Sequence, residues 1–147
     1  MQYSPLIKQT IRLAKSAIVE GRHDKAMNHL RAGLKYADKA NCSDERVYIL
    51  GTMASLLSEK GEFQEAENRV IEAMTTQGAH PEAYLSVKCD LIEILIRRGR
   101  VKEAQAMAVR VRAELREEFP EPSSRPPIIM ALDKFLSDLV GSLTRQK

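Results

Sequence analysis

Residues 59–74 read EKGEFQEAENRVIEAM, with a glycine standing among residues that favour helices. A glycine inside a helix costs about 1 kcal/mol relative to alanine, so Gly61 indicates a break between two helices. Glycine readily adopts the left-handed conformation that ends one helix and turns the chain back. The stretch therefore predicts a helix on each side of Gly61, joined by a tight turn.

The same arrangement occurs three times along the chain. GRHDKAMNHLRAGL from Gly21, GEFQEAENRVIEAM from Gly61 and GRVKEAQAMAVRVR from Gly99 align without gaps. An alanine follows each glycine after five residues, and another compact residue comes seven positions later. Small side chains at this spacing let two helices approach closely along one stripe. We expect the helix contacts of three pairs at Ala26, Gly33, Ala66, Ala73, Ala104 and Val111.

Apolar residues at helical spacing flank each of these glycines, and no alternating strand pattern is present. The sequence therefore predicts an all-α fold of antiparallel helix pairs within one domain. Residues 119–127 read FPEPSSRPP, with four of the six prolines, and we expect no helix there. The expected helices cover 5–20, 23–39, 44–60, 63–77, 81–98, 101–118 and, after the proline-rich linker, 128–147.

The last expected helix repeats apolar residues such as Leu132, Leu136 and Leu143. A stack of helix pairs leaves an apolar face at its end, which a terminal helix can cover. We interpret residues 128–147 as this cap. The alternative is that the broad apolar face forms a homodimer or grips another partner.

These segments resemble the tetratricopeptide repeat, whose turn reads approximately G-D-Y-D-E-A. GEFQEA at 61–66 is close to this pattern, and GRVKEA and GRHDKA are looser versions. The resemblance implies a right-handed superhelical stack of about seven helices. Its three units would span 3–41, 43–79 and 81–118, and so cover most of residues 1–118. The period of 38–40 residues exceeds the family's usual length of about 34, so a HEAT-like array with a period of about 40 is the alternative.

The family characteristically binds peptides or protein segments in a concave groove lined by the first helix of each unit. The resemblance therefore implies a protein-interaction module: an adaptor, a scaffold or a partner-specific chaperone. Two cations around Tyr48 predict an acidic partner segment with an apolar anchor, and solvated surface is the alternative for any single residue. The expected groove residues are Lys8, Ile11, Lys15, Tyr48, Ser55, Ser86, Glu93 and Arg97, and the same registers add Ile18, Gly51, Ser58 and Cys89.

Basic side chains gather within residues 97–112, where Glu103 is the only acid. Such a patch could hold phosphates or an acidic protein segment, so the runner-up is a regulatory or nucleic-acid-binding helical-repeat module. The lack of aromatic residues between these cations disfavours nucleic-acid binding. The alternative explanation for the patch is that it is the solvent-exposed end of a helix without a binding role. The patch comprises Arg98, Arg100, Lys102, Arg110 and Arg112.

Catalysis has little support in the sequence. His23 and His29 are six residues apart, which places them on nearly opposite faces of a helix, and no phosphate loop or nucleophile elbow occurs. We expect no enzyme, cofactor or metal site. Cys42 and Cys89 follow no metal or redox spacing and favour a reduced compartment, and a disulfide bond between them is the alternative. With a net charge of +3 and no apolar run of about 18 residues, we expect a cytoplasmic protein without a membrane segment.

Overall fold

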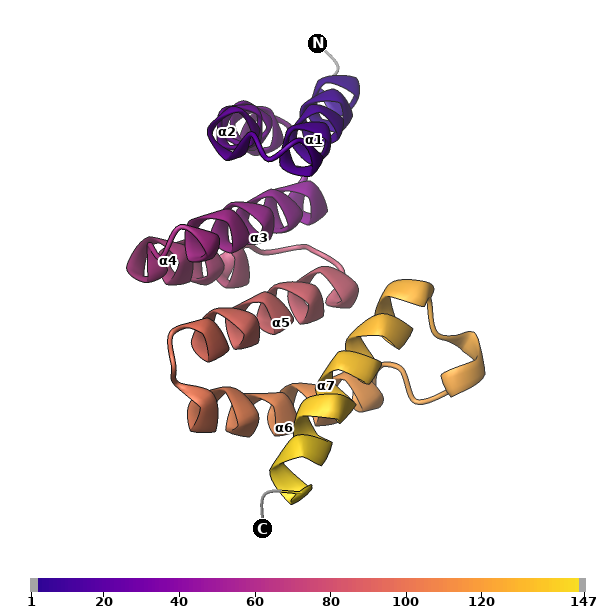
Figure 1. Cartoon of the computed structure of the whole chain (residues 1–147). Coiled ribbons are helices and arrows are strands. Elements are labelled where there is room, and N and C mark those ends of the chain that lie inside the picture. Colours follow the sequence, from indigo (N-terminus) through magenta and orange to yellow (C-terminus); the bar gives the residue numbers. More distant parts are fainter. Residues whose placement is uncertain (1–2, 146–147) are drawn as a thin grey trace.

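The structure is a computed structural model that describes residues 3–145, with side chains described as far as residue 142. Every regular element in this range is helical, as predicted (Figure 1). The helix ends lie within two residues of the expected positions, and residues 146–147 of the last expected helix lie outside the described range. The elements are α1 (Ser4–Val19), α2 (His23–Ala40), α3 (Ser43–Glu59), α4 (Phe63–Thr75), α5 (Pro81–Arg97), α6 (Val101–Glu118), the 3-10 turn η1 (Pro122–Ser124) and α7 (Pro127–Arg145).

One expectation about the linker is wrong in detail. Residues 119–127 were expected to contain no helix, yet η1 forms one short turn there. Pro122 stands at its start, where a proline is tolerated because its missing N–H would have no helical partner. Ser124 closes the turn by donating its backbone N–H to the carbonyl of Glu121 at 3.1 Å. The prolines therefore end α6 but still permit a single turn before α7.

The three predicted glycine turns share one geometry. Gly21, Gly61 and Gly99 have φ values of 75°, 81° and 86°, in the left-handed region. The N–H that follows each glycine donates to the carbonyl five residues earlier, at 2.8, 2.9 and 2.9 Å. This pattern satisfies carbonyl groups that the end of a helix would otherwise leave without partners. The turns that join α1 to α2, α3 to α4 and α5 to α6 are thus equivalent.

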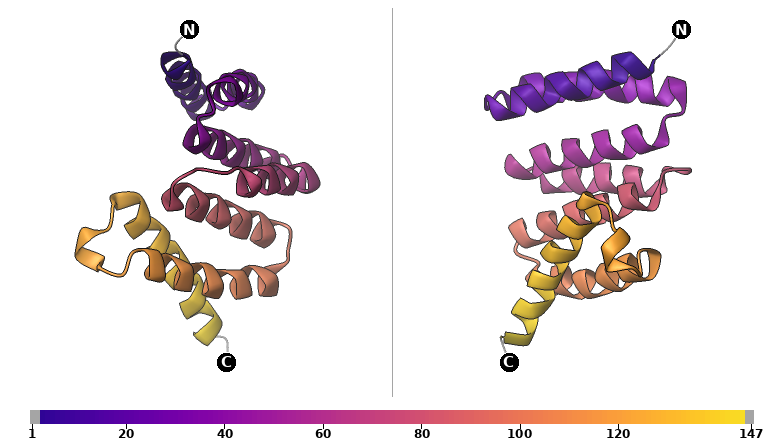
Figure 2. Two further views of the ribbon diagram at one scale, coloured as in Figure 1. Left: turned by 180° about the vertical axis from the view of Figure 1, so that it is seen from behind. Right: turned by 90° about the vertical axis from the view of Figure 1, so that its right-hand side faces the viewer.

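The helices pack in sequential pairs. α1 lies against α2, α3 against α4 and α5 against α6, and successive pairs touch through α2–α3, α4–α5 and α3–α5 (Figures 1 and 2). The alanines five residues after the glycines are completely buried, and the positions seven residues later are buried as well. A larger side chain at the first of these positions would push the paired helices apart. The predicted contact residues Ala26, Gly33, Ala66, Ala73, Ala104 and Val111 are therefore confirmed as buried.

Two apolar clusters form the core, and α5 contributes to both. Val87 and Ile94 of α5 join the cluster built from α1 to α4. Ile92 of α5 joins a second cluster with α6 and α7, in which Ile129 and Leu136 are fully buried. α7 contacts both α5 and α6 and runs diagonally across that pair (Figures 1 and 2). It thus covers one side of the last helix pair.

Candidate functional site

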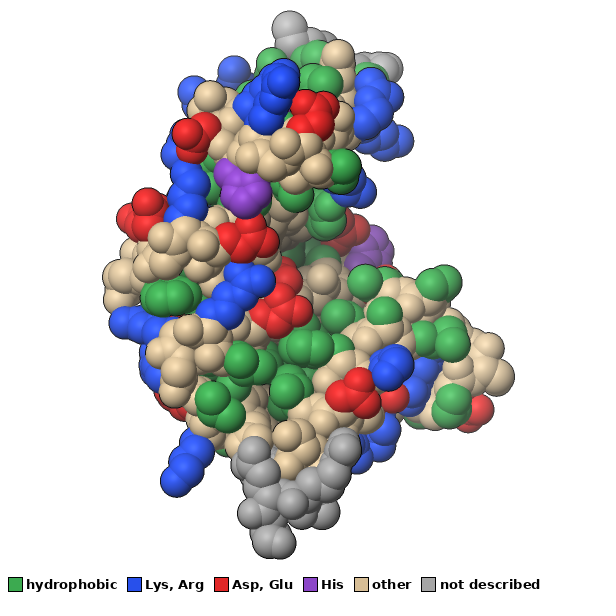
Figure 3. All heavy atoms as spheres, viewed as in Figure 1, with side chains coloured by type: hydrophobic (Ala, Val, Ile, Leu, Met, Phe, Trp, Pro, Cys, Tyr) green, Lys and Arg blue, Asp and Glu red, His purple; other side chains and the backbone are tan. Residues whose placement is uncertain are grey.

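A pocket of about 390 Å³ opens between α3, α5 and the start of α7. Tyr48 and Ser55 line it from α3, and Ser86 and Asp90 line it from α5. Ile128, the second residue of α7, completes the rim. In the space-filling view the surface is hollowed between the start of α7 and the helices behind it (Figure 3). The pocket therefore depends on three helices that are distant in sequence.

Four of the predicted groove residues meet at this place. Tyr48, Ser55 and Ser86 line the pocket itself. The Lys15 ammonium lies 5.4 Å from the centre of the Tyr48 ring, which brings α1 to the same region. This distance is within the range of a cation–π contact. Side chains from α1, α3 and α5 are thus brought together at these four positions, and their role in binding stays a prediction.

The other four predicted groove residues do not line the pocket. Lys8, Glu93 and Arg97 are exposed on α1 and on the last two turns of α5. Ile11 is half-buried and packs against the first core cluster. Their role in binding stays a prediction.

Three further residues from the same registers are buried, so their expected place in an open groove is wrong. Gly51 lies where α3 meets α5, and Ser58 is 4% exposed with no hydrogen-bond partner for its hydroxyl oxygen in the described range. Cys89 is also 4% exposed and belongs to the second core cluster, together with Ile129 of α7. For two of them the physical reason is tertiary packing, because α5 covers Gly51 and the second core cluster, which α7 completes, encloses Cys89.

Asp90 is one of the pocket residues that the sequence did not predict. A Cβ atom placed on Gly51 would come within 2.7 Å of its Oδ2 atom, so the glycine makes room for the carboxylate. No hydrogen bond or ion pair to this carboxylate occurs within the described residues. Burial, helped by the charge of Glu93, raises the pKa of Asp90 to about 7. The sequence signal available for it was an acid among the apolar residues of α5.

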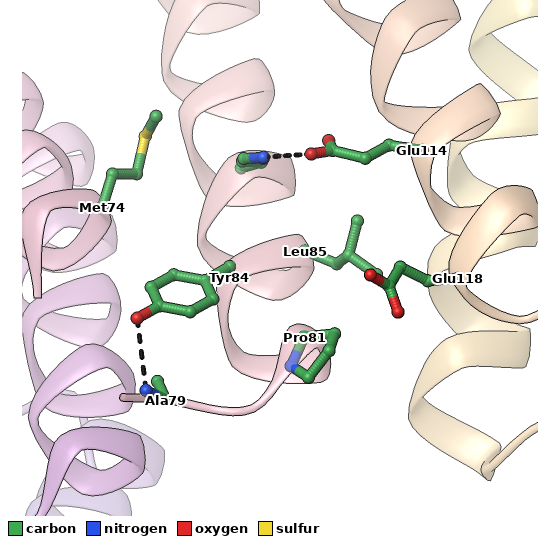
Figure 4. A pocket seen from close by; sticks show the side chains of 8 residues that line it. Met74, Ala79, Pro81, Tyr84, Leu85, Glu114 and Glu118 are labelled. Atoms are coloured by element: carbon green, nitrogen blue, oxygen red, sulfur yellow. Dashed lines mark hydrogen bonds and ion pairs between the residues drawn. The ribbon is translucent and has the colours of Figure 1, made fainter. Parts of the chain in front are cut away.

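A second pocket, also of about 390 Å³, lies between α4, α5 and α6 (Figure 4). Tyr84 crosses it: its hydroxyl accepts the N–H of Ala79 at 3.2 Å and donates to the carbonyl of Thr76. Lys88 and Glu114 form an ion pair of 2.7 Å along its wall. The Tyr84 hydrogen bonds hold the connection before α5 in place, and the Lys88–Glu114 ion pair joins α5 to α6. The second pocket uses the face of α5 opposite to the Asp90 pocket, so the two are separate.

The predicted basic patch is partly neutralised. Arg98 pairs with Glu67 of α4, and Arg100 pairs with the same carboxylate at 3.3 Å and with Glu103 at 2.5 Å. No ion pair is present, within the described side chains, for the remaining cations of the patch, Lys102, Arg110 and Arg112. The sequence could not anticipate the contribution of Glu67, because that residue is more than thirty positions away.

Metal and disulfide chemistry find no support between residues 3 and 142. No group of three or more His, Cys, Asp and Glu side chains is placed to hold a metal ion. Cys42 and Cys89 are both free thiols, so the alternative of a bridge is not realised. His80 and Asp44 form a pair at 2.5 Å that joins the start of α5 to the start of α3.

Comparisons of the chain with protein-family models, curated proteins and solved structures found no match. The fold and the site themselves define the class: an all-α protein whose seven helices, over residues 3–145, pack in sequential pairs. None of the described helices is long and apolar enough to cross a membrane.

Proposed function

We propose that this protein is a protein-interaction module that binds a partner segment along the face formed by α1, α3 and α5. The observation that carries the proposal is the convergence of Lys15, Tyr48, Ser55 and Ser86 around one open pocket. The tetratricopeptide resemblance implies a binding groove at the same four positions. Equivalent glycine turns and buried small residues in all three helix pairs support a tetratricopeptide-like repeat as the scaffold.

The chemistry of the pocket suits a protein ligand. Tyr48 is 43% exposed and Ile128 is 47% exposed, so two large apolar side chains face solvent at its edge. Tyrosine is over-represented among the residues that dominate binding energy at protein interfaces. Hydroxyl groups of Ser55 and Ser86 can exchange hydrogen bonds with a backbone or a polar side chain. A segment that lies across the pocket would cover the apolar groups and pair the polar ones.

A photo-crosslinking amino acid at position 55 tests where partners bind. In the native host, it should capture a discrete partner that the same amino acid at Val109 does not capture. Val109 is 48% exposed on α6, away from the proposed face, and serves as the control. Equal capture from both positions would argue against binding at the α1–α3–α5 face.

Calorimetry with the captured partner then measures how much Tyr48 contributes. Tyr48→Ala should weaken binding by at least about 1 kcal/mol, while circular dichroism stays unchanged. Arg110→Glu should have little effect. The reverse result, in which Arg110→Glu abolishes binding and Tyr48→Ala has no effect on it, would place the binding site at the basic patch and refute the proposal.

The runner-up, a regulatory or nucleic-acid-binding module, has less support. Glu67 and Glu103 pair with two of the five cations in the patch, which weakens its attraction for phosphates. A titration of generic RNA and DNA at rising salt separates the two functions. Tight binding that weakens steeply with salt, and that Arg110→Glu removes, would favour the runner-up.

A further inference from the structure

Within the described residues, the Asp90 carboxylate has no counterion. Asp90 is half-buried, and a carboxylate shielded from water without a hydrogen bond or an opposite charge is disfavoured in its charged form. Asp90 lines an open pocket, however, and no hydrogen bond or ion pair to it is found in the described range. Gly51 leaves the space that the carboxylate occupies. The arrangement thus holds an acid in place and leaves its partner to come from outside.

The groups around Asp90 favour a cation as that partner. Glu82 and Asp90 are the charged residues that line the pocket, and both are acidic. Glu93 adds a further negative charge from α5. From α3 come the Tyr48 ring and the Ser55 hydroxyl, and from α7 the apolar Ile128. Two described cationic groups lie near this set: the Lys15 ammonium over the Tyr48 ring, and the His80 imidazole, which is paired with Asp44 and also interacts with Glu82.

The pocket also has walls that fit the stem of a long side chain. Val47 of α3, Val87 of α5 and Ile128 of α7 contribute apolar surface to its lining. Lysine and arginine bury their methylene stems along such surfaces while their charged ends reach a polar group. A free inorganic cation would leave these apolar walls unused.

We propose that the pocket between α3, α5 and α7 receives a lysine or arginine side chain of the bound partner segment, and that the cation of this side chain pairs with Asp90. This inference rests on the proposed function and identifies the chemistry of its ligand. It also divides the face by charge. An acidic residue of the segment would meet Lys15 beyond Tyr48, whereas the basic residue enters the pocket.

Occupation of the pocket has a measurable protonation signature. Burial and Glu93 raise the pKa of Asp90 to about 7, so the free protein holds a partly protonated acid at neutral pH. A cation in contact with the carboxylate favours its charged form and lowers that pKa. Binding of a basic side chain should therefore release protons near pH 7, and the release should disappear in Asp90→Asn.

The test uses random peptides displayed on phage and selected on the full chain. Peptides whose binding is lost in Tyr48→Ala should carry a lysine or arginine next to an apolar residue. Replacement of that basic residue by glutamine should reduce affinity at least about tenfold on the wild type and hardly at all on Asp90→Asn. Asp138→Asn, which removes an exposed carboxylate paired with Lys134 on α7, is the matched control and should behave like the wild type.

The outcomes separate this inference from the proposed function. Tyr48-dependent peptides that bind equally well to wild type and Asp90→Asn would overturn the inference and leave the proposed function standing. A selection that returns no Tyr48-dependent peptide would count against both. The cation could also come from a free amine instead of a protein segment. Titration with n-butylammonium, followed by the carboxyl carbon resonance of Asp90, tests this possibility. Saturation by this free amine as tightly as by the peptides would overturn docking of a protein segment.

Discussion

Replacement of Asp90 by asparagine should stabilise the unliganded protein, and increasingly so as the pH rises. The pKa of Asp90 is raised from 3.8 to about 7, chiefly by burial. Because the folded state holds this proton more tightly than the unfolded chain, the folded state loses stability as pH rises between these two values. One pKa unit corresponds to about 1.4 kcal/mol, so the full shift corresponds to about 4 kcal/mol. Asparagine keeps the shape of the side chain but has no proton to lose.

The expected gain follows from the same linkage. Asp90→Asn should exceed the wild type in unfolding free energy by about 1 kcal/mol near pH 4.5 and by up to about 4 kcal/mol near pH 8. Urea unfolding, followed by circular dichroism at several pH values, measures both proteins. Other titrating groups, including the His80–Asp44 pair, are common to the two proteins and cancel in the difference.

A constant difference across this pH range would refute the reasoning, because it would mean that Asp90 titrates alike in the folded and unfolded states. A difference that falls with pH would reverse the sign and imply a stabilising partner for the carboxylate. Asp138→Asn provides the control. Its carboxylate is exposed beside Lys134, so its effect should be small and nearly independent of pH.

Three further changes test the scaffold. Ala66→Leu should overpack the α3–α4 pair and lower the free energy of unfolding by about 1–3 kcal/mol, measured by thermal or urea unfolding. A variant as stable as the wild type would contradict the close packing at this completely buried position. Deletion of residues 127–147 should bare the apolar surface under α7 and cause aggregation in light scattering. A dimeric parent that becomes a soluble monomer would instead support self-association through α7, and a stable, soluble monomer from a monomeric parent would contradict both interpretations. His80→Asn should reduce the free energy of unfolding mainly at acidic pH, which urea unfolding at several pH values measures. The hydrogen bond and the charge of Asp44 raise the pKa of His80 above 6.5. The stabilisation by the imidazolium is therefore complete below pH 6.5 and is lost as the pH rises through the raised pKa.

Most of the fold could be predicted from local signals. Gly61 and its two counterparts mark the turns because few other residues adopt their left-handed conformation, and Pro81 marks the start of α5. The buried small residues followed from the spacing after each glycine. These features depend on a few neighbouring residues, which is why a single sequence is enough to locate them.

The site was predictable only in part, because it depends on how helices meet. The regular register placed Gly51 and Cys89 on the open face, but close packing between α3 and α5 buries the first. The second lies in the core that α7 completes. The crossing of α7 over α5 and α6 is a tertiary arrangement that the apolar pattern of residues 128–147 does not specify. For the same reason, the contribution of Ile128 to the pocket could not be foreseen.

The position of α5 in both apolar clusters has a consequence for how the molecule opens. Stacks of helix pairs can unfold piecemeal, since each pair contacts only its neighbours. Here Val87 and Ile94 tie α5 to the first cluster, whereas Ile92 ties it to the second. One half of the molecule comprises α1 to α4, and the other comprises α6 and α7. If either half separated from α5, apolar residues on one face of α5 would be exposed to water. Amide hydrogens of α5 should therefore exchange among the slowest in the protein, and the two halves should lose their protection together.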